Sequence, residues 1–145
     1  MAIQIKTLDQ LKLMRKAGLV VGQTLDLMRA AIVPGVTTND LNEIAIRNLA
    51  ANNAKSNFLN YHGFPAVICA SINDEIVHGI PNDRPIKDGD VVSIDFGAII
   101  EGWHGDAAFS VIAGTKNLED QKLLDTCEES MWRGIAAGKM GANLT

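Results

Sequence analysis

The sequence has few cysteines and no long apolar run, and each absence excludes a class of protein. Cys69 and Cys127 are the only two cysteines among 145 residues, too few for the disulfide framework of a small secreted domain. No segment approaches the roughly 20 consecutive apolar residues that a membrane-spanning helix needs. The first residues carry Lys6, Asp9 and Lys12 where a signal peptide requires its apolar run. The sequence therefore predicts a cytoplasmic protein that does not enter a membrane.

An excess of basic residues is also missing. The chain has 13 Lys and Arg against 17 Asp and Glu, for a net charge of −4, so its composition gives no reason to expect sequence recognition of nucleic acid. Apolar residues make up 47% of the chain and charged residues 21%, which is typical of a globular protein. The length suits one ordinary domain, so residues 1–145 are predicted to form a single domain.

The most strongly patterned stretch, residues 91–111, predicts a β-hairpin. Both arms are rich in β-branched and apolar residues, and Glu101-Gly102 supplies a two-residue turn between them. With this turn, Gly97 faces Asp106 across the hairpin. Since side chains alternate between the faces of a strand, Asp95 shares a face with both. The other face is predicted to be buried and carries Val92, Ile94, Phe96, Ala98, Ile100, Trp103, Ala107, Phe109 and Val111.

Asp95 and Asp106 are therefore expected to be diagonal neighbours on one face of the hairpin. At a separation of about 7 Å and an effective dielectric of about 20, two carboxylates repel by about 2 kcal/mol. A shared proton, a basic side chain or a bound cation would offset this repulsion. The hairpin contains no Lys or Arg, which favours a divalent cation. The alternative is a pair of acids that face water, because one face of an antiparallel sheet is often solvated.

Three amphipathic helices are predicted around this hairpin. Thr7 and Gln10 form a capping box that begins the first helix, which ends before Pro34-Gly35. Thr37 or Thr38 begins the second, and Asn117 or Asp120 the third. The apolar side of the first helix consists of Leu11, Met14, Gly18, Val21, Leu25, Met28 and Ile32. The predicted buried residues of the other two are Leu41, Ile44, Ala45 and Leu49, then Leu124, Cys127, Met131 and Ile135.

The region between the second helix and the hairpin holds candidate binding residues. Residues 51–66 are rich in Asn and are predicted to form a loop with an aromatic cluster of Tyr61, His62 and Phe64. Such a cluster either binds a ligand or packs the loop against itself. A short strand is predicted over 67–72, and an extended segment ends at His78 before Gly-Ile-Pro. This histidine either faces a cleft or has a structural role.

The end of the chain resembles its beginning. A long helix runs into Pro34-Gly35-Val36-Thr37-Thr38, and a second long helix runs into residues 140–145. When Gly35 is aligned with Gly141, the predicted helix that precedes Gly35 aligns with the predicted helix that precedes Gly141. This alignment predicts that a second copy of the same structural unit begins near the end of the chain.

Six segments that run in order through the sequence resemble type I methionine aminopeptidases of peptidase family M24. The resemblance covers nearly the whole chain. It implies an α+β fold, the first half of the pseudo-twofold pita-bread fold, in which an antiparallel hairpin sheet is covered on one face by long helices. The segments are Pro34-Gly35-Val36-Thr37-Thr38, Tyr61-His62-Gly63-Phe64-Pro65, Ser71-Ile72-Asn73, His78-Gly79-Ile80-Pro81, the run from Asp88 to Asp95, and Gly102-Trp103-His104-Gly105-Asp106.

The resemblance also implies roles for individual residues. Asp95 would chelate one of two divalent metals (Mn, Fe, Co or Zn) and Asp106 would bridge both, so that a hydroxide between the metals attacks the substrate carbonyl. His78 would be catalytic through a hydrogen bond near the scissile amide. Pocket residues for the methionine side chain would be Tyr61, Phe64 and Cys69. Asn73 and Glu75 would hold a monovalent cation through backbone carbonyls, and Phe58 replaces a smaller residue of some members.

In the family the other metal ligands, one His and two Glu, come from a second half of the fold that this sequence lacks. The chain is therefore expected to be the N-terminal half of a cytoplasmic, metal-dependent aminopeptidase and to be inactive alone. The substrate would be the N-terminal methionine of nascent polypeptides with a small second residue, a role compatible with ribosome association. The full-length protein is expected to be a monomer. The alternative is a non-catalytic binding or scaffold module on the same fold.

Overall fold

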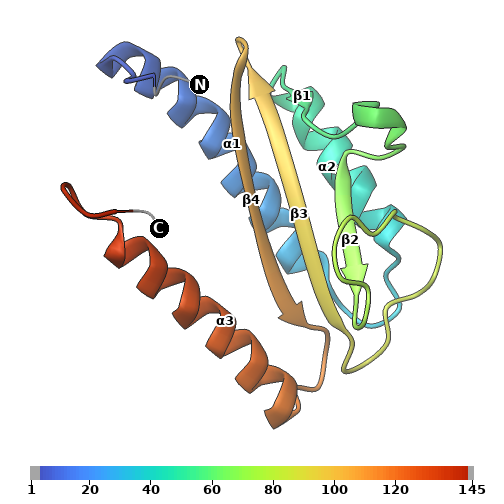
Figure 1. Cartoon of the computed structure of the whole chain (residues 1–145). Helices are drawn as coiled ribbons and strands as arrows, with labels where there is room; N and C mark the ends of the chain where they lie inside the picture. Colours follow the sequence, from blue (N-terminus) through green and yellow to red (C-terminus); the bar gives the residue numbers. More distant parts are fainter. Residues whose placement is uncertain (1–3, 144–145) are drawn as a thin grey trace.

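An antiparallel sheet with two helices behind it forms the centre of the structure (Figure 1). The computed structural model describes residues 4–143. The helices and strands, in chain order, are α1 (Leu8–Ala31), α2 (Thr38–Ala51), β1 (Lys55–Ser56), the short 3₁₀ helix η1 (Tyr61–Gly63), β2 (Ile68–Ile72), β3 (Val91–Ile100), β4 (Trp103–Ile112) and α3 (Leu118–Ala137). The predicted loop 51–66 thus contains a short strand and a helical turn.

The hairpin of β3 and β4 forms with the predicted turn. Glu101 and Gly102 have φ values of 52° and 80°, and this pair of positive angles is what a two-residue type I′ turn requires. Gly97 lies opposite Asp106, as predicted. Because the turn sets which residues face each other, the register of the whole hairpin follows from it, and both predictions are confirmed.

β3 is the central strand of the sheet. β4 pairs along one edge of β3, and β1 and β2 pair in succession along the other. α1 and α2 lie behind one face, whereas α3 stands beside β4 (Figure 1). This arrangement confirms the predicted α+β fold class, with long helices on one face of an antiparallel sheet.

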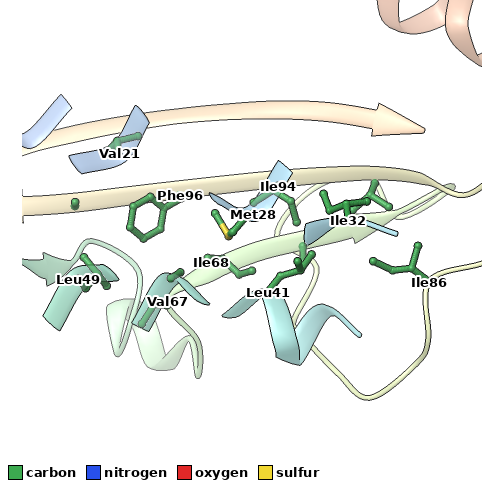
Figure 2. Close-up of a cluster of buried hydrophobic side chains, with 14 of the residues drawn as sticks. Val21, Met28, Ile32, Leu41, Leu49, Val67, Ile68, Ile86, Ile94 and Phe96 are labelled. Carbon is green, nitrogen blue, oxygen red and sulfur yellow. The ribbon is translucent and has the colours of Figure 1, made fainter. Parts of the chain in front are cut away.

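The core lies between this face of the sheet and the two helices. Figure 2 shows Phe96 and Ile94 of β3 close to Met28 of α1, with Ile68 of β2 beside them. The four predicted core residues at alternate positions of β3, Val92, Ile94, Phe96 and Ala98, are all 0% exposed. Across from them on β4, Phe109 is only half-buried and Ala107 is exposed, because β4 is an edge strand.

α1 begins as predicted but buries a different part of its length. The Thr7 side chain accepts from the backbone N–H of Gln10, and the Gln10 side-chain oxygen accepts from the backbone N–H of Thr7, so both halves of the capping box form. Leu11 and Met14, which were predicted to be buried, are 47% and 36% exposed. The first turns of α1 project past the edge of β4 (Figure 1), where no strand lies beneath them. The prediction was therefore wrong for these two residues.

α2 begins at the first of its two candidate caps. The Thr37 side chain accepts from the backbone N–H of Asp40, whose carboxylate in turn accepts from the backbone N–H of Thr37. The predicted residues Leu41, Ala45 and Leu49 are buried. The apolar period of this helix therefore matched the face that packs on the core.

The prediction for α3 was wrong in its burial. Asn117 caps this helix as expected, but no residue of α3 is buried. Cys127, predicted to be a packed thiol, is exposed, and Met131 and Ile135 are 51% and 58% exposed. The apolar period is present, but among the described elements α3 contacts mainly the edge strand β4, which leaves its apolar side open.

None of the helices within residues 4–143 combines the length and the apolar character that a membrane span requires.

The predicted internal repeat has a counterpart in the backbone. Gly35 lies as many residues after the end of α1 as Gly141 lies after the end of α3. Both glycines have a positive φ, 99° and 83° respectively. Such a conformation is accessible mainly to glycine. Leu144 and Thr145, which complete the aligned segment, lie outside the described residues. The repeat stays a prediction.

Replacement of Phe96 by alanine should strongly destabilise the chain. Phe96 is the largest fully buried side chain, and its removal leaves a cavity between the sheet and α1. The expected loss is about 3–5 kcal/mol in the free energy of unfolding, measured by urea denaturation. Leu19→Ala, at a position 55% exposed, should change it by only about 0.5 kcal/mol. Equal effects of the two substitutions would contradict this assignment of the core.

Candidate functional site

The two predicted aspartates lie on the face of the sheet that α1 and α2 leave open. Asp95 is on β3, and Asp106 is on β4 opposite Gly97, two residues further along β3. Asp95 is half-buried and Asp106 is exposed. The pKa of Asp95 is raised, first by burial and second by the negative charge of Asp106, while nearby His78 acts in the opposite direction. The predicted shared face is therefore confirmed, and the two carboxyl groups affect each other electrostatically.

The surroundings of the two aspartates suit a cation. Within residues 4–143, neither aspartate forms an ion pair with a basic side chain. One carboxyl oxygen of Asp95, Oδ1, is buried and has no hydrogen-bond partner. A buried oxygen in this state loses its interaction with water and gains none in return. A divalent cation would supply the missing interaction, since carboxylate oxygens are its preferred ligands.

The same aspartates do not make a complete metal site by themselves. The described part of the chain has no group of three or more His, Cys, Asp or Glu side chains that could hold a metal ion together. Protein sites for catalytic divalent metals generally use at least three side-chain ligands. The residues present therefore fit one part of a metal site.

An apolar cavity of about 480 Å³ opens beside Asp95. It brings together residues from η1, β2, β3 and the segments between them, although these lie far apart in the sequence. The predicted aromatic cluster lines this cavity. The rings of Tyr61 and His62 meet edge-to-face, with their centroids 4.4 Å apart. The residues of the wall are Asn57, Phe58, Tyr61, His62, Phe64, Cys69, His78 and Asp95.

His78 reaches the cavity from an irregular segment. The prediction of an extended segment ending at His78 was wrong, because residues 76–78 form no strand and His78 has a φ of 59°. Gly79 ties this segment to β2, since its N–H donates to Ser71 Oγ at 3.1 Å and its carbonyl accepts from the N–H of Ala70 at 2.9 Å. A side chain at Gly79 would collide with the Ala70 carbonyl. Left-handed backbone at a non-glycine residue is strained and is common at functional sites.

Cys69 forms part of the cavity wall next to Asp95. It is buried on β2 directly opposite Asp95 on β3. Burial, followed by the negative charges of Asp95 and Asp106, raises the pKa of its thiol to about 11. The thiol is therefore protonated at neutral pH, and it presents a small, weakly polar surface to the cavity.

Asn73 and Glu75 lie outside this cavity, in the turn after β2. The Asn73 side chain donates to Asp90 at 2.8 Å and accepts from the N–H of Val91 at 2.9 Å. Glu75 accepts from the N–H of Ile72 at 2.8 Å. These side-chain contacts stabilise the turn, and the predicted monovalent cation would be held by backbone carbonyls.

Asn57 is a cavity residue that sequence reasoning missed. It follows β1 in a stretch without hydrophobic periodicity. The one signal was Gly97, because a glycine inside a strand often marks the close approach of another group. The sequence offered no means of identifying Asn57 as that group.

Comparisons with known proteins show the family of this chain. Residues 12–145 match the profile of metallopeptidase family M24. The chain is 42% identical over 140 residues to Methionine aminopeptidase 1 of Bacillus subtilis, a match that covers 97% of this chain and 56% of that protein. The chain thus spans about half the length of the curated relatives it matches.

Solved structures show the same relation. The crystal structure of methionine aminopeptidase from Rickettsia prowazekii superposes with a TM-score of 0.90 at 40% identity and covers 92% of this chain and 54% of that one. The Xaa-Pro dipeptidase from Bacillus anthracis, at 21% identity, has a TM-score of 0.79 over 93% of this chain and 36% of its own. The second match shows the fold alone, and the two together confirm the first half of the pita-bread fold.

The two cysteines should differ sharply in reactivity. Cys127 is exposed, whereas Cys69 is buried and its pKa is raised to about 11. Because the thiolate is the reactive form, Cys69 should react with iodoacetamide at pH 7.5 at least about 100-fold more slowly than an ordinary thiol. Mass spectrometry of the labelled chain, with Cys127→Ser as the control, measures each rate. Rapid labelling of the Cys127→Ser variant would contradict the burial of Cys69.

Asp95→Asn should stabilise the metal-free chain at neutral pH. Folding raises the pKa of Asp95 above its ordinary value of 3.8, so its ionisation favours the unfolded chain. The penalty is absent below pH 3.8 and grows as the pH rises through the folded-state pKa. With a chelator present, the thermal unfolding midpoint of Asp95→Asn should therefore be higher than that of wild type at pH 7 and equal to it near pH 3. Asp26→Asn, on the exposed side of α1, serves as the control. A lower midpoint for Asp95→Asn at pH 7 would contradict the raised pKa.

Proposed function

Because the chain belongs to metallopeptidase family M24, we propose that it carries the first half of the active site of a methionine aminopeptidase. The complete enzyme would remove the N-terminal methionine from nascent polypeptides whose second residue is small. The observation that carries this proposal is the placement of Asp95 and Asp106 on one open face, beside an apolar cavity that His78 also lines. The identity of 42% to a methionine aminopeptidase supports it.

Asp95 and Asp106 are the proposed metal ligands. Asp95 would bind one of two divalent ions (Mn, Fe, Co or Zn), and Asp106 would bind both. When bound, such ions polarise a carbonyl group and make water a stronger nucleophile. The unpartnered Oδ1 of Asp95 supports its role as a ligand. Burial and the charge of Asp106 raise the pKa of Asp95, and a nearby cation would lower that pKa and favour the ionised carboxylate.

The cavity is the proposed site of the methionine side chain. Tyr61, Phe64 and Cys69 would form an apolar wall against an unbranched thioether. The protonated thiol of Cys69 suits this role, because a thiolate would place a third negative charge beside the two aspartates. Phe58 would narrow the outer part of the pocket. His78 would donate a hydrogen bond to the substrate near the scissile amide, from the wall of the cavity that Asp95 also lines.

Two aspartates do not complete such a site, so we propose that its remaining ligands lie in a segment outside residues 1–145. Residues 1–145 would then be one domain-sized half that is inactive alone. The complete protein would be a cytoplasmic monomer that acts on chains at or near the ribosome. Backbone carbonyls at Asn73 and Glu75 would hold a monovalent cation that stiffens the turn after β2.

A chimera tests this proposal. Residues 1–145 would be joined to the part of the Bacillus subtilis enzyme beyond the matched region, and methionine release from a Met-Ala-Ser peptide would be measured with Mn²⁺. The chimera should release methionine, and residues 1–145 alone should not. Asp106→Asn should lower release by at least about 100-fold, since even residues behind metal ligands contribute 10–100-fold.

The matched control is Asp26→Asn, which should keep the activity of the parent chimera. Full activity of the Asp106→Asn chimera would refute the proposed site and favour a binding or scaffold module. Release of methionine by residues 1–145 alone would refute the requirement for further ligands.

A further inference from the structure

Within residues 4–143 two buried side-chain oxygens have no hydrogen-bond partner, and both belong to residues of the same cavity. They are Oδ1 of Asp95 and Oδ1 of Asn57. The proposed cation would account for Asp95, but Asn57 has no role in the proposed site. Buried polar atoms are rarely left unpaired, because the loss of water is unfavourable without a replacement. The position of Asn57 therefore needs its own explanation.

Asn57 lies in the same row of the sheet as Asp106. Its backbone N–H donates to the carbonyl of Gly97 at 3.2 Å, which continues the pairing that places Ser56 opposite Ala98. Gly97 in turn lies opposite Asp106. Residues in one row of a sheet direct their side chains to the same face. Asn57, Gly97 and Asp106 thus follow one another across three neighbouring segments of chain.

The side chain of Asn57 occupies the space that Gly97 leaves empty. A Cβ atom at Gly97 would lie 2.5 Å from Nδ2 of Asn57 and 2.8 Å from its Cγ, closer than real Cβ contacts allow. Through this space the Asn57 Nδ2 donates to the backbone carbonyl of Gly105 at 3.3 Å. Gly105 immediately precedes Asp106 on β4.

β4 is also held at Gly105 from its other side. A Cβ atom there would lie 2.8 Å from the backbone of α1 at Ala17 and Gly18. The edge strand is thus fixed between α1 on one face and Asn57 on the other, at the residue next to Asp106. β4 pairs with β3 on one side and has no neighbouring strand on the other in the described part of the chain. The contacts at Gly105 therefore add to this pairing in holding the strand beside Asp106.

We propose that Asn57 is a positioning residue for Asp106. By binding the Gly105 carbonyl across Gly97, it fixes the second carboxylate at the separation from Asp95 that a divalent cation requires. This inference rests on the proposed function, because only a cation shared by both aspartates makes their separation matter. Residues that orient metal ligands typically change metal affinity by about 10–100-fold.

The first test needs no metal. Asn57→Ala should raise the amide hydrogen-exchange rates of residues 104–107 of β4 by about 10-fold, measured by NMR, and leave those near Ser110 unchanged. Asn39→Ala is the matched control, since it removes an asparagine side chain that bonds Asp83 at 2.7 Å on another part of the surface. Unchanged exchange at residues 104–107 in Asn57→Ala would overturn the proposal.

The second test is the Mn²⁺ affinity of the chimera described above, measured by calorimetry together with its thermal midpoint, because residues 1–145 supply only part of the metal site. Asn57→Ala should weaken binding by at least about 10-fold while the midpoint stays near that of wild type, because it also removes an unpaired buried oxygen. Gly97→Ala should weaken binding similarly by displacing Asn57. The double variant should bind no more weakly than Asn57→Ala alone, since both changes act through one contact.

The outcomes separate this inference from the proposed function. If Asp106→Asn weakens Mn²⁺ binding and Asn57→Ala does not, the positioning role is refuted. Additive losses in the double variant would refute it too. If the chimera binds Mn²⁺ equally with and without Asp106→Asn, or not at all in either case, the proposed metal site fails, and the exchange experiment alone decides whether Asn57 positions β4.

Discussion

The register of the β3–β4 hairpin is the constraint on which the rest of the structure depends. Two residues with positive φ, Glu101 and Gly102, form a turn whose twist matches that of the strands it joins. A slip of one residue on either strand would turn that strand's aspartate toward α1 and expose its apolar residues. Burial of an unpaired carboxylate in an apolar core is strongly unfavourable. The core face and the acidic face are therefore specified together by one turn.

The two faces of the sheet contribute differently to stability and to function. The covered face holds Phe96 and its neighbours at 0% exposure and supplies the burial that stabilises the fold. The open face collects unfavourable features, which include the raised pKa of Asp95, its unpartnered Oδ1 and the left-handed backbone of His78. Such features persist where the surrounding structure holds them in place, and they are typical of sites that bind a ligand.

Glycines determine how closely the parts of this site approach one another. Gly97 admits the side chain of Asn57, Gly105 admits the backbone of α1, and Gly79 admits the carbonyl of Ala70. Each contact joins two separate segments of the chain and brings one of them next to Asp95, Asp106 or His78. The precision of the site thus depends on positions that carry no side chain at all.

The sequence by itself determined the features that depend on neighbouring residues. The hairpin, its register, the helix cap at Thr7 and the shared face of the two aspartates follow from turn and capping chemistry and from the period of two along a strand. For the other two helices the sequence offered two candidate caps each, and the structure has Thr37 and Asn117. Only the tertiary structure decided which apolar residues find a partner. Leu11 and Met14 are exposed on the first turns of α1, and α3 keeps its apolar side open although its period is that of a packed helix. It also decided that Asn57 lies over Gly97, because that contact joins strands through a pairing that no local pattern in residues 51–66 encodes.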